Sequence, residues 1–263
     1  MPASLTLLAL SLLALQGCPD ASAPEPDLST PEGICVRAIW AVGGPENLLK
    51  LRAVTWKGKG RLYWHASGIP YEVSGATQGG RQGVAIAESE VKGQRHRLVR
   101  VINGDKGWVQ LNERVEELEP AMLKEERERL YENWLATLIP LTRGEVTVEM
   151  AGTIDIDGRP ALGVRMTAAG HRPVGLYYDR ETGLLRKKVT HITDPARDNK
   201  PVLQETYYGE YQRVAGVLVA FKVQVFWDGK LYLDTQMTEV KPQGKLPDEV
   251  FSRPQPNERD VQR

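Results

Sequence analysis

Cysteine is scarce in this chain, which has only Cys18 and Cys35 among its 263 residues. A disulfide between them would close a loop made mostly of proline, serine, alanine and acidic residues, so we expect no disulfide framework. An excess of charge is also absent, because Lys plus Arg and Asp plus Glu each total 34. Nucleic-acid-binding domains usually carry a basic excess, and we therefore expect no nucleic-acid partner.

Motifs of catalysis and metal binding are missing as well. The sequence contains no HExxH, no paired CxxC and no G-x-S-x-G. The four histidines, His65, His96, His171 and His191, are far apart, and we expect them to be surface or half-buried residues. If Asp155 and Asp157 of "DIDGRP" were ligands of a calcium loop, Val164 would stand where the bidentate Glu belongs, so this segment predicts a hairpin turn. The segment "GATQGGRQG" predicts a flexible loop. We predict no enzyme activity, no catalytic residue, no metal site and no cofactor.

Long hydrophobic runs are limited to the N-terminus. Leu5 to Leu15 has the length of a signal-peptide core but not the ~20 apolar residues that span a bilayer. The following Leu15-Gln16-Gly17-Cys18 resembles a bacterial lipobox, which implies cleavage before Cys18 and lipidation of its thiol. Ordinary cleavage after Ala21-Ser22-Ala23 is the alternative, although Pro24 disfavours it, and a non-exported protein is the third reading.

The domain organisation follows from composition. We predict a lipoprotein signal peptide over 1–17, and a lipidated cysteine with a proline-rich tether over 18–31, where four prolines and one large apolar residue cannot pack. One domain then occupies 32–254, and the last residues, 255–263, form a disordered tail.

Apolar and polar residues alternate with a period of two through most of that domain. The alternation predicts strands with one apolar and one wet face, as antiparallel sheets allow, and Gly-bearing turns separate them. We expect an α+β, mainly β protein built on a single curved antiparallel sheet of roughly eleven to thirteen strands. The clearest alternating segments are 145–150, 162–167, 221–227 and 231–237, and the clearest turns are 103–107, 157–159, 180–183 and 228–230.

Two segments have helical spacing instead. The first begins at Ile34, stops at Gly43-Gly44 and restarts with Pro45. The second, "EPAMLKEERERLYENWLATLIPL", places Leu123, Leu130, Tyr131, Trp134 and Leu138 on one stripe and Glu125, Glu128 and Arg129 on the opposite face, and Pro140 is expected to end it. Helices covering the concave side of a curled sheet can leave an apolar cavity.

Several phrases together resemble the LolA/LolB-like outer-membrane lipoprotein-sorting family. They are the lipobox, the tether, "GGPENLLKLRAVTWKGKG", "YYDRETGLLRKK", "YYGEYQRVAGVLVAFKVQV" and "LDTQMTEVKPQGKLPDEVFSRP". Beyond the tether, the resemblance covers roughly Ile34 to Pro254. The resemblance implies a half-barrel sheet of roughly 11 strands with helices over its concave face. The lipobox implies an exported protein in the bacterial cell envelope, lipid-anchored through Cys18 and facing the periplasm, and we expect the outer membrane rather than the inner one.

The expected function is non-covalent binding of acyl chains of lipids or lipoproteins for their transport or localisation. Trp40 and Trp134, on the covering helices, are our candidates for contact with the acyl chains. The alternative is a regulatory or scaffold lipoprotein that binds an envelope partner protein through the same fold. We expect two basic clusters to face water, namely Lys57, Lys59 and Arg61, and Arg186, Lys187 and Lys188. The alternative is that they contact anionic lipid headgroups or a partner protein.

Overall fold

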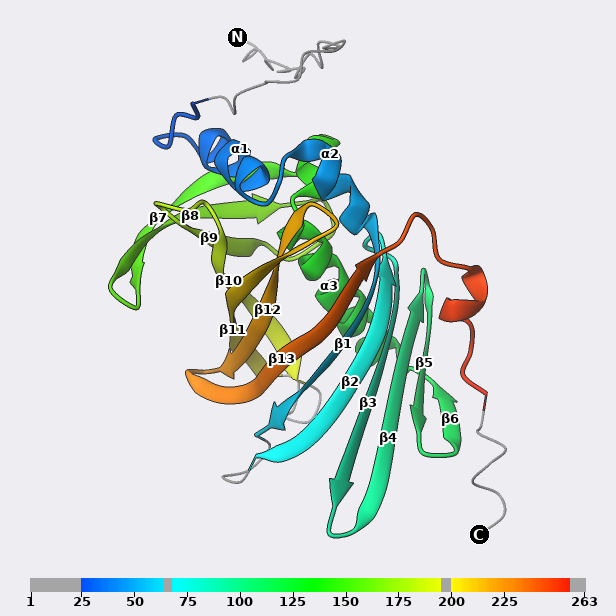
Figure 1. Cartoon of the computed structure of the whole chain (residues 1–263). Helices are drawn as coiled ribbons and strands as arrows, with labels where there is room; N and C mark the ends of the chain where they lie inside the picture. The colour runs from blue at the N-terminus through cyan, green and yellow to red at the C-terminus, as the bar shows by residue number, and fades with distance from the viewer. Residues whose placement is uncertain (1–24, 64–67, 195–199, 256–263) are drawn as a thin grey trace.

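A single antiparallel sheet of 13 strands dominates the computed structural model (Figure 1). The structure describes residues 25–63, 68–194 and 200–255. The strand order is β6-β5-β4-β3-β2-β1-β13-β12-β11-β10-β9-β8-β7, so every strand except the edges pairs with two neighbours. The predicted mainly β class with one antiparallel sheet is confirmed, and the strand number is 13 where the family resemblance implied roughly 11.

Two meanders make up the sheet. The first contains β1 (Ala53–Leu62), β2 (Ile69–Gln78), β3 (Gln82–Val91), β4 (Gln94–Asn103), β5 (Lys106–Leu111) and β6 (Arg114–Glu117). The second contains β7 (Thr147–Ile156), β8 (Arg159–Thr167), β9 (Val174–Asp179), β10 (Leu185–Asp194), β11 (Lys200–Val214), β12 (Val217–Trp227) and β13 (Lys230–Pro242).

The helices lie before and between the meanders. The N-terminal group is α1 (Pro31–Ala41), α2 (Pro45–Leu48) and the 3-10 helix η1 (Leu49–Arg52). The central group is α3 (Pro120–Ala136) and α4 (Ile139–Thr142), and the 3-10 helix η3 (Asp248–Phe251) follows β13. Thr30 caps α1 through a hydrogen bond from the Gly33 N–H to its hydroxyl (3.1 Å), the usual device for a helix that begins with proline.

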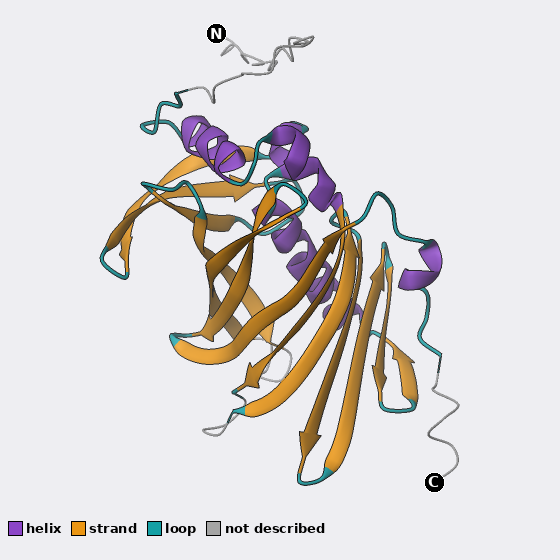
Figure 2. Ribbon diagram, in the orientation of Figure 1, coloured by secondary structure: helices purple, strands orange, loops and turns teal. Residues whose placement is uncertain are grey.

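The sheet curves around α3, which crosses its concave face (Figures 1 and 2). α3 contacts β4 in the first meander and β9 and β10 in the second, while α1 contacts β7 and β8. η3 covers the opposite face, where Phe251 packs with Ala53, Ala76, Val99 and Val101. The predicted covering of the concave face by two helical segments is therefore confirmed.

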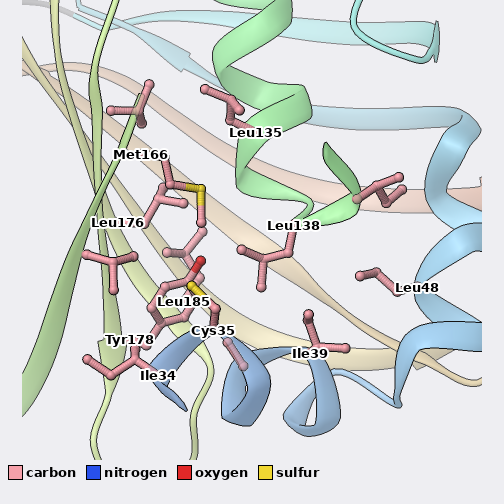
Figure 3. Close-up of a cluster of buried hydrophobic side chains, with 14 of the residues drawn as sticks. Ile34, Cys35, Ile39, Leu48, Leu135, Leu138, Met166, Leu176, Tyr178 and Leu185 are labelled. Carbon is pink, nitrogen blue, oxygen red and sulfur yellow. The ribbon is translucent and has the colours of Figure 1, made fainter. Parts of the chain in front are cut away.

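The main hydrophobic core lies between α1, α3 and the second meander (Figure 3). The period-two pattern of β8 and β9 points alternate residues inward, and Val164, Met166, Val174 and Leu176 are each 0% exposed. Leu135 from α3 is also 0% exposed. Burial of this kind contributes ~25 cal/mol per Å² of apolar surface, so this layer fixes both helices on the sheet.

The two meanders meet where β1 pairs with β13, which are the first and last strands along the chain but lie in the middle of the sheet. Gly60 lies opposite Thr235 in this ladder, and a Cβ at Gly60 would come within 1.9 Å of the Asp234 carbonyl oxygen. Only glycine fits this approach, so position 60 is fixed by the pairing. A bulge between Lys57 and Gly58 accompanies the junction and bends the strand.

Three local predictions had different outcomes. "DIDGRP" forms the predicted hairpin turn, with Asp157 and Gly158 at φ 54° and 76°, the left-handed pair of a two-residue hairpin. "GATQGGRQG" is not a flexible loop, because 75–78 belong to β2 and 82–83 to β3, and only 79–81 form the turn. α3 ends at Ala136, not at Pro140, which lies inside α4 after a left-handed Leu138 (φ 64°).

Candidate functional site

The helices do not fill the concave face completely, and a cavity of about 340 Å³ remains between them and the sheet. This volume lies at the lower end of the ~300–1,000 Å³ typical of small-molecule sites. The walls come from both helix groups and both meanders. They include Ala38, Val42, Leu48 and Leu51 of the N-terminal helices, Leu130, Asn133, Trp134, Ala136, Thr137 and Leu138 of the central group, and, from both meanders, Val54, Trp56, Thr77, Tyr178, Leu185, Tyr208, Tyr211, Val223, Met237 and Val240.

Aliphatic and aromatic side chains dominate these walls, and two of the wall hydroxyls are bonded to backbone carbonyl groups. The Tyr211 hydroxyl donates to the Leu185 carbonyl oxygen (2.6 Å), and the Thr137 hydroxyl donates to the Trp134 carbonyl oxygen (2.6 Å). The Tyr178 hydroxyl is buried and makes no hydrogen bond with the described residues. Such walls suit an apolar guest, since water inside would find few partners.

An ion network holds α3 on the second meander beside the cavity. Arg172, in the β8–β9 loop, donates through both terminal nitrogens to Glu125 (2.9 and 3.0 Å). One of these nitrogens also lies 2.9 Å from Glu132 Oε1, and the Arg172 backbone N–H donates to Glu128. Burial alone would lower the Arg172 pKa, but its bonds to Glu125 and the charges of Glu132 and Glu128 raise it. The half-buried guanidinium therefore stays charged among its carboxylate partners.

Lys188 of β10 lies at the other side of this network. Its ammonium donates to the Asn133 side-chain oxygen (2.6 Å), while the Thr190 hydroxyl donates to Glu132 (3.1 Å). Lys188 is 3% exposed and Glu132 is 1% exposed. Burial lowers the Lys188 pKa, and the nearby Glu132 carboxylate counteracts part of that effect. Because Asn133 also lines the cavity, the polar network forms one end of the apolar walls.

Two predictions about charged residues are wrong here. Glu125 and Glu128 were expected on the wet face of the central helix, but Glu125 is buried and both bind Arg172. Lys188 was expected to face water with Arg186 and Lys187, but strand alternation turns it into the concave face. Lys187 pairs with Glu205 (2.6 Å) on the other face. Lys57, Lys59 and Arg61 are exposed, as predicted.

His171 extends the same network. Its Nδ1 lies 3.0 Å from a Glu128 carboxylate oxygen, and its ring stacks on Tyr131 with centroids 3.5 Å apart. His96 and His191 lie on separate strands, β4 and β10, and His65 falls outside the described residues. Within residues 25–63, 68–194 and 200–255, no group of three or more His, Cys, Asp or Glu side chains could hold a metal ion.

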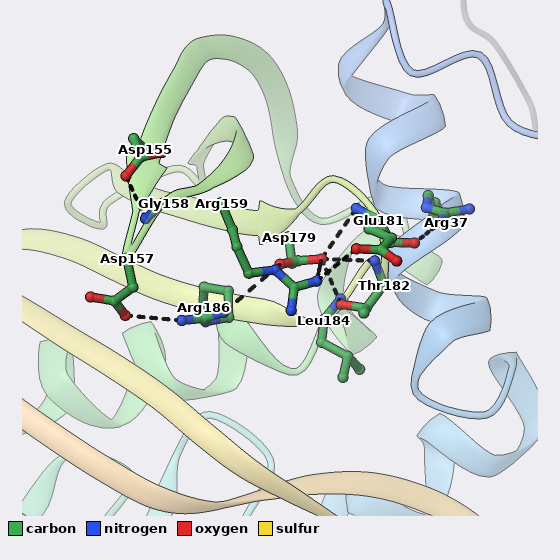
Figure 4. Close-up of polar contacts among 10 residues, drawn as sticks. All are labelled: Arg37, Asp155, Asp157, Gly158, Arg159, Asp179, Glu181, Thr182, Leu184 and Arg186. Atoms are coloured by element: carbon green, nitrogen blue, oxygen red, sulfur yellow. Dashed lines mark hydrogen bonds and ion pairs between the residues drawn. The ribbon is translucent and has the colours of Figure 1, made fainter.

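A second network connects α1, which contributes Ala38 to the cavity wall, with the β9–β10 turn (Figure 4). Asp179, at the end of β9, accepts hydrogen bonds from the Thr182 N–H (2.8 Å) and hydroxyl (3.0 Å) and pairs with Arg159 (2.9 Å). Burial alone would raise the Asp179 pKa, but the Thr182 bonds and Arg159 lower it. Arg37 of α1 donates to the Glu181 carbonyl oxygen in the same turn. The α1 helix is thereby attached to the β9–β10 turn.

The residues singled out from the sequence occupy different places. Trp134 is 7% exposed and lines the cavity. Trp40, on α1, is 36% exposed and is not among the cavity-lining residues. Cys35 is 0% exposed in the core, and Cys18 lies outside the described residues. No helix in the described part of the chain has the length and apolar character needed to cross a membrane.

Sequence comparison gives no match to this chain, either among protein-family models or among curated proteins. Solved structures do match. A LolA superfamily protein from Nitrosomonas europaea superposes with a TM-score of 0.54 at 12% identity, covering 85% of this chain and 97% of the other. A DUF1329 family protein from Desulfovibrio piger gives a TM-score of 0.56 at 9% identity, with the same coverage.

A third solved structure, described as an outer membrane lipoprotein-sorting protein domain from Vibrio parahaemolyticus, gives a TM-score of 0.51 at 10% identity. It covers 85% of this chain and 96% of the other. At such identities the likeness concerns the fold. The resemblance stated from the sequence is confirmed at that level, and the chain has a LolA-like fold.

Proposed function

We propose that this protein is a bacterial cell-envelope lipoprotein whose cavity binds acyl chains of lipids or lipoproteins non-covalently, for their transport or localisation. The observation that carries the proposal is the apolar cavity of about 340 Å³ that lies between both helix groups and both meanders. Each CH₂ transferred from water into such a site contributes ~0.8 kcal/mol, so a chain of several methylenes binds without any polar contact.

Export and anchorage belong to the same proposal. The lipobox at Leu15-Gln16-Gly17-Cys18 would place acyl groups on Cys18, and two or more chains anchor a protein stably. The segment up to Thr30, where α1 is capped, would serve as the tether, with the cavity facing the periplasm and the outer membrane favoured as the site of anchorage. Cys18→Ser should abolish incorporation of labelled palmitate and release the protein from the membrane fraction. Continued lipidation of this variant would contradict the anchor.

The binding test uses a soluble form beginning at Pro19, purified without detergent. Its organic extract is analysed by mass spectrometry, and the delipidated protein is titrated with a fluorescent fatty acid. Stoichiometric fatty acid or phospholipid in the extract, or saturable binding of the probe, supports the proposal. A protein that carries nothing and binds nothing would exclude it and favour the regulatory or scaffold role.

A matched pair of variants ties binding to the cavity. Val223 lines the cavity, and its neighbour Gln224 points to the opposite face of β12. Val223→Trp fills the cavity and should weaken binding at least ~10-fold, the equivalent of losing two or more buried methylenes. Gln224→Trp adds the same side chain outside the cavity and should leave affinity unchanged. Equal affinity of both variants would place the binding site elsewhere.

A further inference from the structure

A second, polar pocket of about 570 Å³ adjoins the apolar cavity. Trp134 and Gly79 line both spaces. The polar pocket lies at the β2–β3 and β4–β5 turns and at the start of the segment after α4. Its walls are Gln78, Gly79, Gly80, Arg81 and Gln82 of the first turn, Asn103 and Gly104 of the second, Tyr131 and Trp134 of α3, and Arg143 and Glu145.

The turn between β2 and β3 packs directly on the α3 aromatic rings. A Cβ at Gly80 would come within 2.7 Å of Trp134 Cδ1 and 3.0 Å of Tyr131 Cδ2, so only glycine allows this approach. Trp134 is thus in contact with a wall of the polar pocket while it also lines the apolar cavity. The Arg143 guanidinium lies 6.0 Å from the Trp134 ring centroid on the side of the polar pocket, at the distance of a cation–π contact.

Positive charge prevails in this pocket. Arg81 and Arg143 line it, against the single carboxylate of Glu145, which lies 3.7 Å from Arg143. Asp105, 3.9 Å from Arg81, is closer to Arg127 (3.1 Å). The Arg81 and Arg143 side chains are 74% and 50% exposed. Neither arginine is held by a close, buried carboxylate, so both have donors for an incoming anion.

We propose that this pocket binds the anionic headgroup of an amphiphile whose acyl chain occupies the cavity. Arg81 and Arg143 would donate charge-assisted hydrogen bonds to a phosphate or carboxylate, and the Trp134 ring would mark the boundary between headgroup and chain. The inference rests on the proposed function and narrows it to single- or multi-chain lipids with a phosphate or carboxylate near the chain.

The test compares pairs of probes that share a chain and differ in the headgroup. Palmitoyl lysophosphatidic acid is paired with monopalmitoylglycerol, and inorganic phosphate is titrated alone. Isothermal titration calorimetry is performed on the delipidated form beginning at Pro19, below the micelle concentration of each probe. The wild-type protein should bind the anionic lipid at least ~10-fold more tightly than the neutral one, as one or two charge-assisted hydrogen bonds provide.

Variants assign the preference to the two arginines. Arg81→Gln/Arg143→Gln should lose the preference for the anion while retaining its affinity for monopalmitoylglycerol within ~2-fold, because the apolar walls are unchanged. The control Arg95→Gln/Arg114→Gln removes the same charge at the β3–β4 and β5–β6 turns, at the other ends of these strands. It should behave like the wild type.

The outcomes separate this inference from the proposed function. Equal binding of both lipids by the wild type, or equal loss of the preference in the control, overturns the headgroup site and leaves acyl binding intact. Phosphate binding as tight as that of lysophosphatidic acid also overturns it, since the pocket would then be an anion site without a lipid. Binding of neither lipid refutes the proposed function itself.

Discussion

Removal of Arg172 is the sharpest test of how α3 is held on the sheet. Arg172 is the main partner of two buried carboxylates, Glu125 at 8% and Glu132 at 1% side-chain exposure. Loss of one member of a buried ion network costs ~3–5 kcal/mol, because the remaining charges stay buried without a partner. Arg172→Met should therefore lower the free energy of unfolding by that amount, or Tm by ~6–20 °C in a domain of this size.

Urea unfolding followed by tryptophan fluorescence provides the measurement. The control Arg114→Met breaks the Arg114–Glu116 pair, whose side chains are 80% and 51% exposed, and should cost less than ~1 kcal/mol. The double variant Arg172→Met/Glu125→Leu should recover part of the loss, since it removes one of the two buried carboxylates that Arg172→Met leaves without its partner. A loss below ~1 kcal/mol for Arg172→Met alone would refute the conclusion that the ion network holds α3 on the sheet.

Three further predictions concern burial and protonation. Met166→Ala, at a fully buried site, should lower the free energy of unfolding in urea by ~2–5 kcal/mol, whereas Met150→Ala, at a 44% exposed position on the edge strand, should lower it by less than ~0.5 kcal/mol. Equal losses would contradict the assignment of the core. Cys35, which is 0% exposed with a pKa raised by burial to about 12, should resist iodoacetamide at pH 8 until guanidinium unfolds the form beginning at Pro19; rapid native alkylation would show an open core. Asp179→Ala should lower the free energy of unfolding at pH 7. This difference from the wild type should be fully present above the unfolded pKa of 3.8 and should vanish as the pH falls through the lower folded pKa, because the carboxylate is then protonated in both states. A difference that persists at pH 2 would assign the effect to packing.

The sheet was accessible to prediction because its pattern is local. Alternation over 162–167 placed Leu162, Val164 and Met166 on one face, and the structure buries all three. The break at Gly43-Gly44 likewise separates α1 from α2 as expected. These features depend on neighbours within a few residues, where spacing alone decides which side chains share a face.

The ion network was not accessible, because its partners are distant in sequence. A helix rich in Glu and Arg is typical of a solvent-exposed helix. Glu132 is a buried acceptor only because Arg172 and Thr190, which are distant in sequence, approach it from the second meander. Lys188 follows two other basic residues, which suggested a solvent-exposed cluster. Strand alternation alone, however, places its side chain on the opposite face of the sheet from that of Lys187, so the sequence did contain the information needed to predict its burial. The polar pocket combines Arg81 with Arg143, a separation that no local pattern reveals.

The pairing of β1 with β13 has a consequence for the order of events during synthesis. These strands lie almost the whole domain apart in sequence, and Val54 and Val240, one from each, both line the cavity. The first meander can form its local hairpins as soon as it emerges, but long-range strand pairing is slow and waits for the last strand. Until β13 docks, the inner face of the first meander is an open, half-apolar surface. The unfinished chain therefore exposes more apolar surface than the folded protein, and it is at this stage that chaperones matter most.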